Sequence, residues 1–370
     1  MNEKRNHLFT ICVIAFILFA FAWADLVQDS GKIATADNAK PVFTWEAFVS
    51  GTYASEYDAF ARETFVSKAK WVKLQTSMDL LAGKEELQGI YLGKGGYLFE
   101  KYAPSAKTLD ELGGKLQKLK KLTDDWNATV MLIPSADNIL RRKLPDGAPY
   151  FDETGFLEQA AMVLGEEHYV DVYSVLNEHQ GEAVYYKTDE HWTALAAFYT
   201  YPAWAEIAKK PRFPYYRKDE VVLEGNCVGE LQRRTRTEGS FDRVSYFPET
   251  ERRLLSVTYD FQTERETMFN TQWLDEGDPN AVFLDDEHVF TKIVSNRKNG
   301  KKLFVLKDSY GDCFLPFLLP HYETIYVMEL EGYKDDPEVF MKGFGHPDTM
   351  DVLILYGVRH FMESFDYTTE

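Results

Sequence analysis

The stretch LFVLKDSYGDCFLPFLLPHY, residues 303–322, joins a short apolar run to a polar turn and a second apolar segment. A short apolar run that is bounded by turn residues is typical of a strand buried on both faces of a sheet. Further runs of this kind occur at residues 128–134, 168–176, 323–329 and 350–357, and helix-like or mixed segments separate them. This alternation predicts an α/β fold, a largely parallel sheet flanked by helices.

The pattern predicts three parts along the chain. Residues 1–24 are expected to form a signal peptide or signal anchor, residues 25–88 a helical lead-in, and residues 89–370 the α/β domain. At the start of that domain, GIYLGKGGYLFEKY at residues 89–102 predicts a β-hairpin, because no Gly-Lys-Ser/Thr follows to support a phosphate loop. Residues 211–300 are polar and lack a clear period, which predicts an irregular or partly β insertion.

The amino terminus has the layout of an export signal. Lys4 and Arg5 precede an uncharged apolar run from Leu8 to Ala24, which ends at Asp25. The segment Ala22–Ala24 offers a small-x-small cleavage site, and an uncleaved run would anchor the chain with its basic end inside. Both fates place the rest of the chain outside the cytoplasmic membrane, membrane-anchored or secreted.

Composition excludes one class of partner. A formal net charge of −18 repels nucleic acid, and no dense Lys/Arg cluster offsets it locally, so no nucleic-acid partner is expected. Three cysteines cannot build a disulfide scaffold, although Cys227 and Cys313 are free to pair in an exported chain. Neither lies in a Cys-x-x-Cys motif, so no structural zinc is implied.

Ser309 follows the apolar run at residues 303–306 almost at once. In parallel sheets, active sites gather at the carboxyl ends of the strands. A serine on such a strand-to-helix turn is exposed near backbone N–H groups that bind a developing oxyanion, which makes Ser309 a candidate nucleophile. An Asp-Ser pair after a strand also serves simply to cap the next helix.

Asp189 and His191 lie two residues apart in YYKTDEHWT, ahead of an apolar helical pattern. In an extended segment such residues project to one side, so the carboxylate can orient the imidazole while its other nitrogen faces a substrate. Ser309, His191 and Asp189 would then supply a nucleophile, its base and the base's orienter. The alternative stays open: Thr193 or Asp189 caps the following helix and His191 is structural.

The same residues resemble a known family. YYKTDEHWT with its downstream helix, followed by VLKDSYGDCFLPFL at residues 305–318, is similar to the DHHW family and the related alginate O-acetylation proteins of the AlgJ/AlgX type, whose catalytic domains resemble SGNH hydrolases. The order of the other elements agrees: GGYLF at residues 95–99, LIP at residues 132–134 and VDVY at residues 170–173 precede Asp-x-His-Trp and Asp-Ser. The likeness spans residues 50 to 357 or so.

The resemblance implies an SGNH hydrolase-like catalytic domain in which Ser309 is the nucleophile, His191 the general base and Asp189 its orienter. Two residues depart from the pattern. Glu190 replaces a second histidine and, at i+1 to both partners, is expected to point away with little effect. Lys307 stands where a Gly-Asp-Ser motif has glycine, which bears on how closely the backbone approaches a substrate.

The resemblance also implies a function: an extracytoplasmic O-acyltransferase or esterase, with acetyl the usual group, acting on a cell-envelope or exported polysaccharide. It implies a membrane-bound O-acyltransferase as partner and acyl donor, and it requires no diffusible cofactor and no metal. Tyr310, Trp192 and Arg359 are candidates for lining the sugar site, although each can equally be structural, and Arg359, after the last strand, is the best placed of the three.

Two alternatives belong to other classes. One is a non-catalytic polysaccharide-binding or assembly protein that keeps the fold, which Lys307 and the 55 aromatic residues would suit. The other is a metallohydrolase that uses Asp189 and His191 with His321 or His360, although no compact metal-ligand motif is present.

Overall fold

The computed structural model describes residues 16, 42, 44–64, 68–286, 288–330, 333 and 337–365. The chain divides into two compact units, Met1–Ala82 and Gly83–Glu370, so the second unit begins a little before the predicted boundary at Gly89. The first unit contains α2 (Trp45–Ser50), α3 (Thr52–Thr64) and α4 (Lys68–Leu81), which lie where helices were expected.

The predicted signal segment, Leu8–Ala24, falls outside the described residues except for Phe16. Among the residues that the structure describes, no helix combines the length and apolar character needed to cross a membrane.

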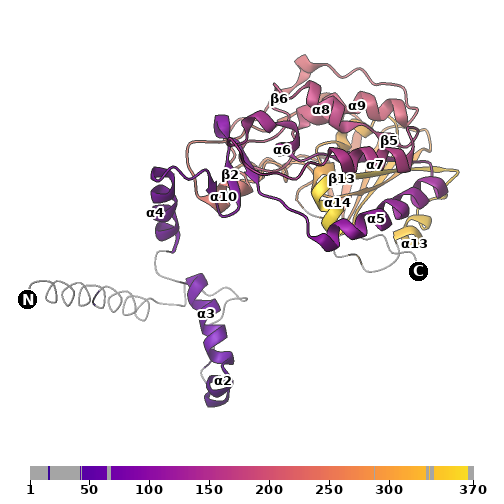
Figure 1. Ribbon diagram of the computed structural model, residues 1–370. Helices are drawn as coiled ribbons and strands as arrows, with labels where there is room; N and C mark the ends of the chain where they lie inside the picture. Colours follow the sequence, from indigo (N-terminus) through magenta and orange to yellow (C-terminus); the bar gives the residue numbers. More distant parts are fainter. Residues whose placement is uncertain are drawn as a thin grey trace, which may run out of the picture. The chain divides into compact units, whose positions relative to one another are not determined.

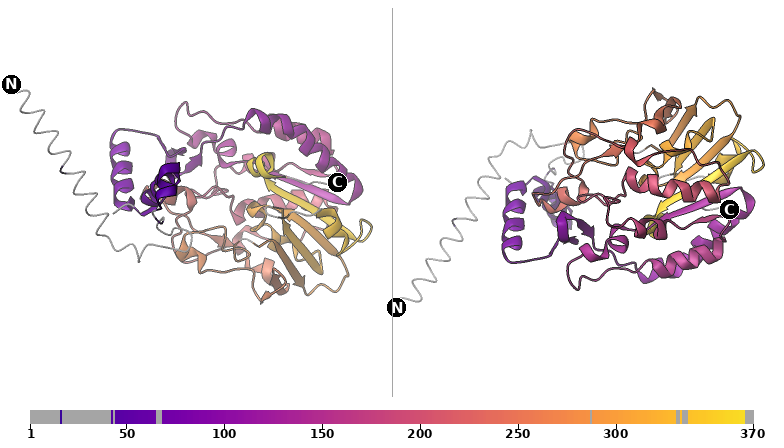
Figure 2. Two further views of the ribbon diagram at one scale, coloured as in Figure 1. Left: turned by 90° about the horizontal axis from the view of Figure 1, so that it is seen from below. Right: turned by 90° about the horizontal axis from the view of Figure 1, so that it is seen from above.

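An eight-stranded sheet runs through the second unit, with helices on both sides (Figures 1 and 2). Neighbouring strands from one edge to the other are β5 (Tyr169–Val170), β4 (Ala128–Ile133), β13 (Met350–Gly357), β11 (Lys302–Lys307), β12 (Thr324–Glu329), β10 (Phe290–Ser295), β8 (Leu254–Tyr259) and β9 (Thr263–Arg265). The pairs from β5 to β12 are parallel, and β10, β8 and β9 add to the edge in antiparallel fashion. The α/β prediction is therefore confirmed, with a parallel half and an antiparallel half.

The apolar runs at residues 128–134, 303–306, 323–329 and 350–357 contain the strands β4, β11, β12 and β13, which are buried on both faces, whereas in the run at residues 168–176 only β5 is a strand and a helix begins at Val172. On β4, Met131 and Ile133 face one core while Val130 and Leu132 face the other. The same alternation of period two holds along β11, β12 and β13. A strand that fills two cores has no polar face, which is why its sequence reads as one continuous apolar run.

Two sets of helices supply the outer layers. The first core is closed by α8 (Val172–Glu178), α9 (Ala194–Ile207) and the 3₁₀ turn η6 (Leu315–Leu318). The second is closed by α5 (Ala106–Asp125), α7 (Thr154–Leu164), α13 (Pro337–Lys342) and α14 (Val358–Ser364). Thr193 caps α9 by accepting the N–H of Ala196, as one of the alternatives had it.

The predicted hairpin is confirmed. Strands β2 (Ile90–Leu92) and β3 (Leu98–Glu100) pair antiparallel around the 3₁₀ turn η2 (Lys94–Gly96), and β1 (Glu86–Leu87) adds a third strand. Gly95 and Gly96 take left-handed conformations there, with φ of 74° and 80°. The glycines therefore serve a tight turn.

The insertion at residues 211–300 is more ordered than its sequence suggested. It supplies β8, β9 and β10 to the main sheet, together with the two-stranded pair β6 (Val221–Val222) and β7 (Ser245–Tyr246). The remaining short elements of the unit are α6 (Ala136–Ile139), α10 (Glu230–Thr235), α11 (Pro248–Glu251), α12 (Trp273–Glu276), η3 (Arg141–Lys143), η4 (Arg217–Asp219) and η5 (Ser309–Gly311).

Candidate active site

Ser309 lies just beyond the carboxyl end of β11, at the start of the 3₁₀ turn η5, and is half-buried. Asp308 fixes this turn: its carboxylate accepts the N–H of Tyr310 at 3.0 Å and the N–H of Gly357, at the end of the neighbouring β13, at 2.8 Å. The expectation of a helix with free N–H groups here is wrong, because only a 3₁₀ turn forms and Asp308 occupies the N–H groups of both Tyr310 and Gly311.

Asp189 and His191 lie in a bend, not in the extended segment that the sequence suggested. The bend is closed at its base by an isolated bridge between Tyr185 and Trp192. The Asp189 carboxylate turns back to accept the backbone N–H of His191 at 3.1 Å. This local turn, common for aspartate, brings the carboxylate beside the imidazole.

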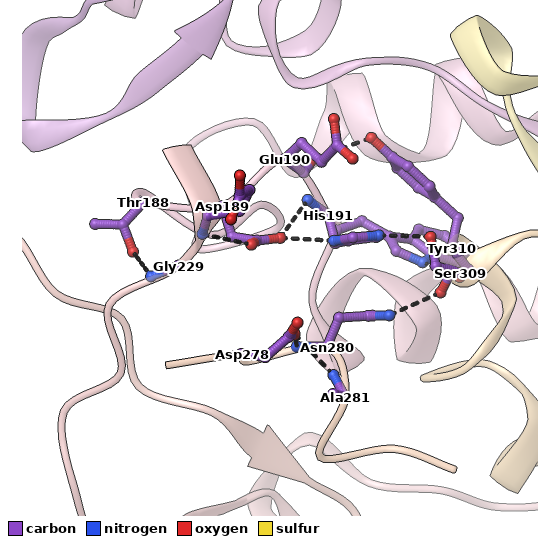
Figure 3. A network of polar contacts seen from close by, with 12 residues as sticks. Thr188, Asp189, Glu190, His191, Gly229, Asp278, Asn280, Ala281, Ser309 and Tyr310 are labelled. Atoms are coloured by element: carbon purple, nitrogen blue, oxygen red, sulfur yellow. Dashed lines mark hydrogen bonds and ion pairs between the residues drawn. The ribbon is translucent and has the colours of Figure 1, made fainter. Parts of the chain in front are cut away.

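The structure brings the three predicted side chains together, as Figure 3 shows. His191 Nδ1 lies 2.6 Å from Asp189 Oδ1, and His191 Nε2 lies 2.8 Å from Ser309 Oγ. With the Nδ1 proton on the carboxylate side, Nε2 is left to accept the hydroxyl proton of Ser309. Residues that are more than one hundred positions apart in the chain thus form one hydrogen-bonded relay.

Charge within the relay is strongly coupled. Burial opposes ionisation of Asp189, but the imidazole of His191 and N–H donors outweigh burial and lower the pKa of the carboxyl group. Burial likewise opposes a charged His191, yet the Asp189 carboxylate, helped by Glu190 and Asp278, raises the pKa of His191 to about 9. The carboxylate therefore stabilises an imidazolium, the species that a general base becomes.

Residues from the insertion hold the Asp189 bend in place. Asp242 accepts the N–H of Lys187 at 2.6 Å and that of Thr188 at 2.8 Å, and Glu230, first in α10, donates its N–H to Asp189 Oδ2 at 3.2 Å. Gly229 passes so close that a Cβ there would lie 2.5 Å from the Cβ of Asp189. The insertion therefore builds part of the site.

Asn280, also from the insertion, supports the serine from behind. Its side-chain amide donates to the carbonyl of Ser309 at 3.0 Å and to Asp312 at 3.2 Å, and the residue is almost fully buried (Figure 3). Asp278 orders the turn by accepting the N–H groups of Asn280 and Ala281. Sequence reasoning missed Asn280, although the turn-forming Asp-Pro-Asn at residues 278–280 marks a fixed bend.

The three predicted sugar-site residues have different surroundings. Trp192 is fully buried and donates its indole N–H to the Tyr310 carbonyl at 2.6 Å, so it is a structural residue and its assignment to the sugar site is wrong. Tyr310 packs its ring 4.8 Å from the His191 ring and lines a cavity beside the relay. Arg359, just after β13, lines the same cavity.

That cavity has a volume of about 180 Å³ and contains two further groups of interest. His360 lines it and also lines the smaller pocket that holds Ser309, while its Nδ1 lies 3.1 Å from Asp308. Glu190 lines the cavity as well, with a carboxylate oxygen 3.8 Å from His360 Nε2, so the expectation that it points away is wrong. The sequence named His360 only as a possible metal ligand; it lies in α14, which follows β13, so the rule that sites gather at strand ends could have assigned it to this cavity.

Lys307 does not crowd the serine. Its side chain is buried, lies 2.7 Å from Asp312 and contacts Glu329. Burial raises the pKa of Asp312 to about 7, although the charge of Lys307 acts in the opposite direction. Lys307 is therefore part of a buried ion triad beneath the turn, and the geometry of the relay does not require the glycine of the family pattern.

The surroundings of the candidate histidines and cysteines in the described part of the chain do not support a metallohydrolase or a disulfide. His321 hydrogen-bonds Tyr201 at 2.8 Å within the core, and no three His, Cys, Asp or Glu side chains in the described part of the chain are grouped to hold a metal ion. Cys227 and Cys313 are both buried and free.

Comparison with known proteins agrees with the resemblance read from the sequence. The model of the DHHW protein family matches residues 165–328. This match contains both the Asp189–His191 bend and Ser309, so the predicted likeness is confirmed over these residues. No curated protein matches the chain.

Solved structures show the fold. A DHHW family protein from Eubacterium siraeum is 23% identical with a TM-score of 0.61, and the match covers 75% of this chain and 94% of that one. PatB1 of Bacillus cereus, solved with a sulfonyl adduct, is 20% identical with a TM-score of 0.59 over 75% of this chain and 98% of its own. The likeness to the O-acetyltransferase domain of Pseudomonas putida AlgJ is weaker, at 13% identity and a TM-score of 0.46.

Proposed function

We propose that this protein is a serine-dependent O-acyltransferase or esterase, with acetyl as the expected group, that acts on a cell-envelope or exported polysaccharide. The observation that carries the proposal is the relay from Asp189 through His191 to Ser309, with both hydrogen bonds at 2.8 Å or less. An alcohol needs a base in this position to become a nucleophile near neutral pH, and the base needs a partner to fix its tautomer.

The proposed reaction has two steps. Ser309 Oγ attacks the acyl carbonyl as its proton passes to His191 Nε2, and collapse of the tetrahedral intermediate releases the donor alcohol, which takes up that proton. The acyl group then rests on Ser309. A sugar hydroxyl, or water in an esterase, gives its proton to His191 and attacks the ester. The second tetrahedral intermediate then collapses, the bond from the acyl carbon to Ser309 Oγ breaks, and His191 returns the proton to the serine. Asp189 stabilises the imidazolium in both steps.

The surroundings of Ser309 suit an acceptor larger than water. The pocket that holds the serine shares His360 with the cavity of about 180 Å³, so a ring in that cavity would lie next to the acyl-serine. Tyr310 offers an aromatic wall, which suits the apolar face of a sugar. No step of this reaction uses a metal or a diffusible cofactor.

Location and partner are parts of the proposal. The basic end and apolar run at residues 4–24 support a protein that works outside the cytoplasmic membrane, anchored or secreted. At that place no cytoplasmic acyl donor is available, so we propose that a membrane-bound O-acyltransferase brings the acyl group across the bilayer.

The direct test is hydrolysis of p-nitrophenyl acetate by the full chain, with and without oligosaccharides. We expect release of nitrophenolate by the wild type and loss of release in Ser309→Ala and His191→Ala. The exposed Ser174 and His346 give matched controls, Ser174→Ala and His346→Ala, which should keep the wild-type rate. Faster release with acetylated sugar as product would identify a transferase. A wild type no faster than folded Ser309→Ala would contradict the proposal.

A further inference from the structure

The cavity beside Ser309 is rich in negative charge. Among its lining side chains, the carboxylates of Glu100, Asp137, Glu190 and Glu363 stand beside the guanidinium of Arg359 and the imidazole of His360. The whole chain carries a formal net charge of −18, which strengthens a negative field at this site.

Arg359 is occupied by protein groups. Its Nη2 lies 2.5 Å from Asp137, its Nη1 donates to the carbonyl of Glu100 at 3.0 Å, and its Nε lies 3.5 Å from the fully buried Glu153. The guanidinium also stacks over Tyr102, 4.9 Å from the ring centre. The charge of the guanidinium is therefore shared by two buried carboxylates, Asp137 and Glu153, which leaves less of it for a ligand carboxylate.

The imidazole of His360 is also shared between protein groups. His360 directs Nδ1 to Asp308 and lies with Nε2 near Glu190, so two carboxylates flank one imidazole. In the pocket of Ser309 itself, Lys307 is enclosed by Asp312 and Glu329. An anionic ligand that enters the cavity would therefore meet carboxylates, and the basic side chains beside them already contact other protein groups.

Glu190 contributes a negative charge where the family pattern commonly has histidine. Its side chain is about one third exposed and faces the cavity, so the charge is open to a ligand. Because Glu190 lies between Asp189 and His191 in the chain, it is carried by the same bend that holds the relay. Glu190→Gln removes the contribution of Glu190 to the pKa of His191 for every reagent alike, so the effect of its charge on ligands is read from the ratio of rates.

We propose that the cavity beside Ser309 selects an acceptor sugar that carries no carboxylate, so that neutral or amino-sugar glycans are substrates and polyuronates are rejected. This inference rests on the proposed function, because it concerns the acceptor of the same serine. A uronate ring would bring a carboxylate against Glu190, while the charge of Arg359 already faces Asp137 and Glu153, and such like-charge contacts are costly and oppose binding.

The test uses three benzenesulfonyl fluorides of similar size: the unsubstituted compound, the anionic 4-carboxy compound and the cationic 4-(2-aminoethyl) compound. Each places a six-membered ring beside the serine it modifies. Rates of sulfonylation at Ser309 are followed by peptide mass spectrometry in the wild type, in Glu190→Gln and in the control Glu158→Gln, which alters an exposed residue of α7.

We expect Glu190→Gln to raise the rate of the anionic reagent, relative to the neutral one, by about threefold or more at low salt. The cationic reagent should shift in the opposite direction, Glu158→Gln should match the wild type, and the difference should shrink as salt screens the charges. An unchanged ratio in Glu190→Gln, with Ser309 labelled throughout, would overturn this inference alone. Absence of Ser309 labelling by all three reagents would contradict the proposed function as well.

Discussion

The turn that carries Ser309 and the bend that carries Asp189 and His191 are built by different means. Ser309 is placed by the strand before it and by Asp308, its neighbour in the chain, which ties the turn to the end of β13. The bend of Asp189 depends on Asp242 and Gly229, which follow it at long distance in the sequence. The proposed nucleophile is thus placed mainly by the sheet, with added support from Asn280, while the proposed base depends on the insertion.

The insertion therefore helps to position the residues of the candidate active site. Its strands β8, β9 and β10 extend the sheet, and its loops fix the Asp189 bend and support the serine through Asn280. Changes within the bend should remove catalysis outright, whereas changes in the insertion should weaken it by moving the bend.

The largest effect is expected for His191→Ala. Without the imidazole, Ser309 has no group to take its proton, so kcat/KM for p-nitrophenyl acetate should fall by about 10³-fold or more. The melting temperature should stay near that of His346→Ala, which removes an exposed imidazole. Activity within tenfold of the wild type would show that the bend does not supply the base.

Asp189→Asn should lower kcat/KM by about 10³-fold to 10⁴-fold. An amide can present its N–H to His191 and so favours the wrong tautomer, and it cannot stabilise the imidazolium. Asp124→Asn, at an exposed position of α5, is the matched control for the same chemical change. Retention of most activity would mean that Asp189 only shapes the bend.

The pH profile should report the charge of the bend. Because the pKa of His191 is raised to about 9, most of the imidazole is protonated at neutral pH and only the neutral fraction acts as a base. We therefore expect kcat/KM to rise by about tenfold per pH unit from about pH 6 to pH 8, and to level off near pH 9. A profile that is already flat above pH 7 would contradict this coupling to Asp189.

Gly229→Ala tests the insertion itself. The new methyl group would lie 2.5 Å from the Cβ of Asp189 and 2.7 Å from the carbonyl oxygen of Thr188, so the bend must shift. We expect about a tenfold loss of kcat/KM and a loss of about 1–3 kcal/mol in the free energy of unfolding. Gly113→Ala, on the exposed face of α5 with nothing close to its new methyl group, should leave activity unchanged and slightly stabilise the helix. Equal activity of the two variants would show that the position of His191 does not depend on the insertion.

The sequence predicted the strands that are buried on both faces, because such strands are apolar along their whole length. Strands such as β4 and β11 lie between two cores and read as continuous apolar runs. Strand β8 alternates between buried and exposed positions near the edge of the sheet, and its pattern LLSVTY merges with the polar insertion. The antiparallel half was therefore predicted only as part of an irregular or partly β insertion.

The sequence predicted the three residues of the relay but not the residues that hold them in place. Asp189, His191 and Ser309 were predicted from the chemistry of an activated serine together with the resemblance to the DHHW family, and their contacts are those expected. Asp242 and Asn280 could not be assigned, because their function comes from long-range contacts that no local pattern records. Trp192 was misplaced because an aromatic residue beside a site has the same sequence signature whether it faces a ligand or the core.

The central claim is that His191 activates Ser309 to form an acyl-enzyme. The most direct measurement is rapid acid quenching of the full chain after mixing with p-nitrophenyl acetate, followed by peptide mass spectrometry. We expect an acetyl group on Ser309 in the wild type, none in Ser309→Ala and very little in His191→Ala at the same time point. Hydrolysis that proceeds at the wild-type rate with no acetyl group on Ser309, or with Ser309 replaced by alanine, would contradict it.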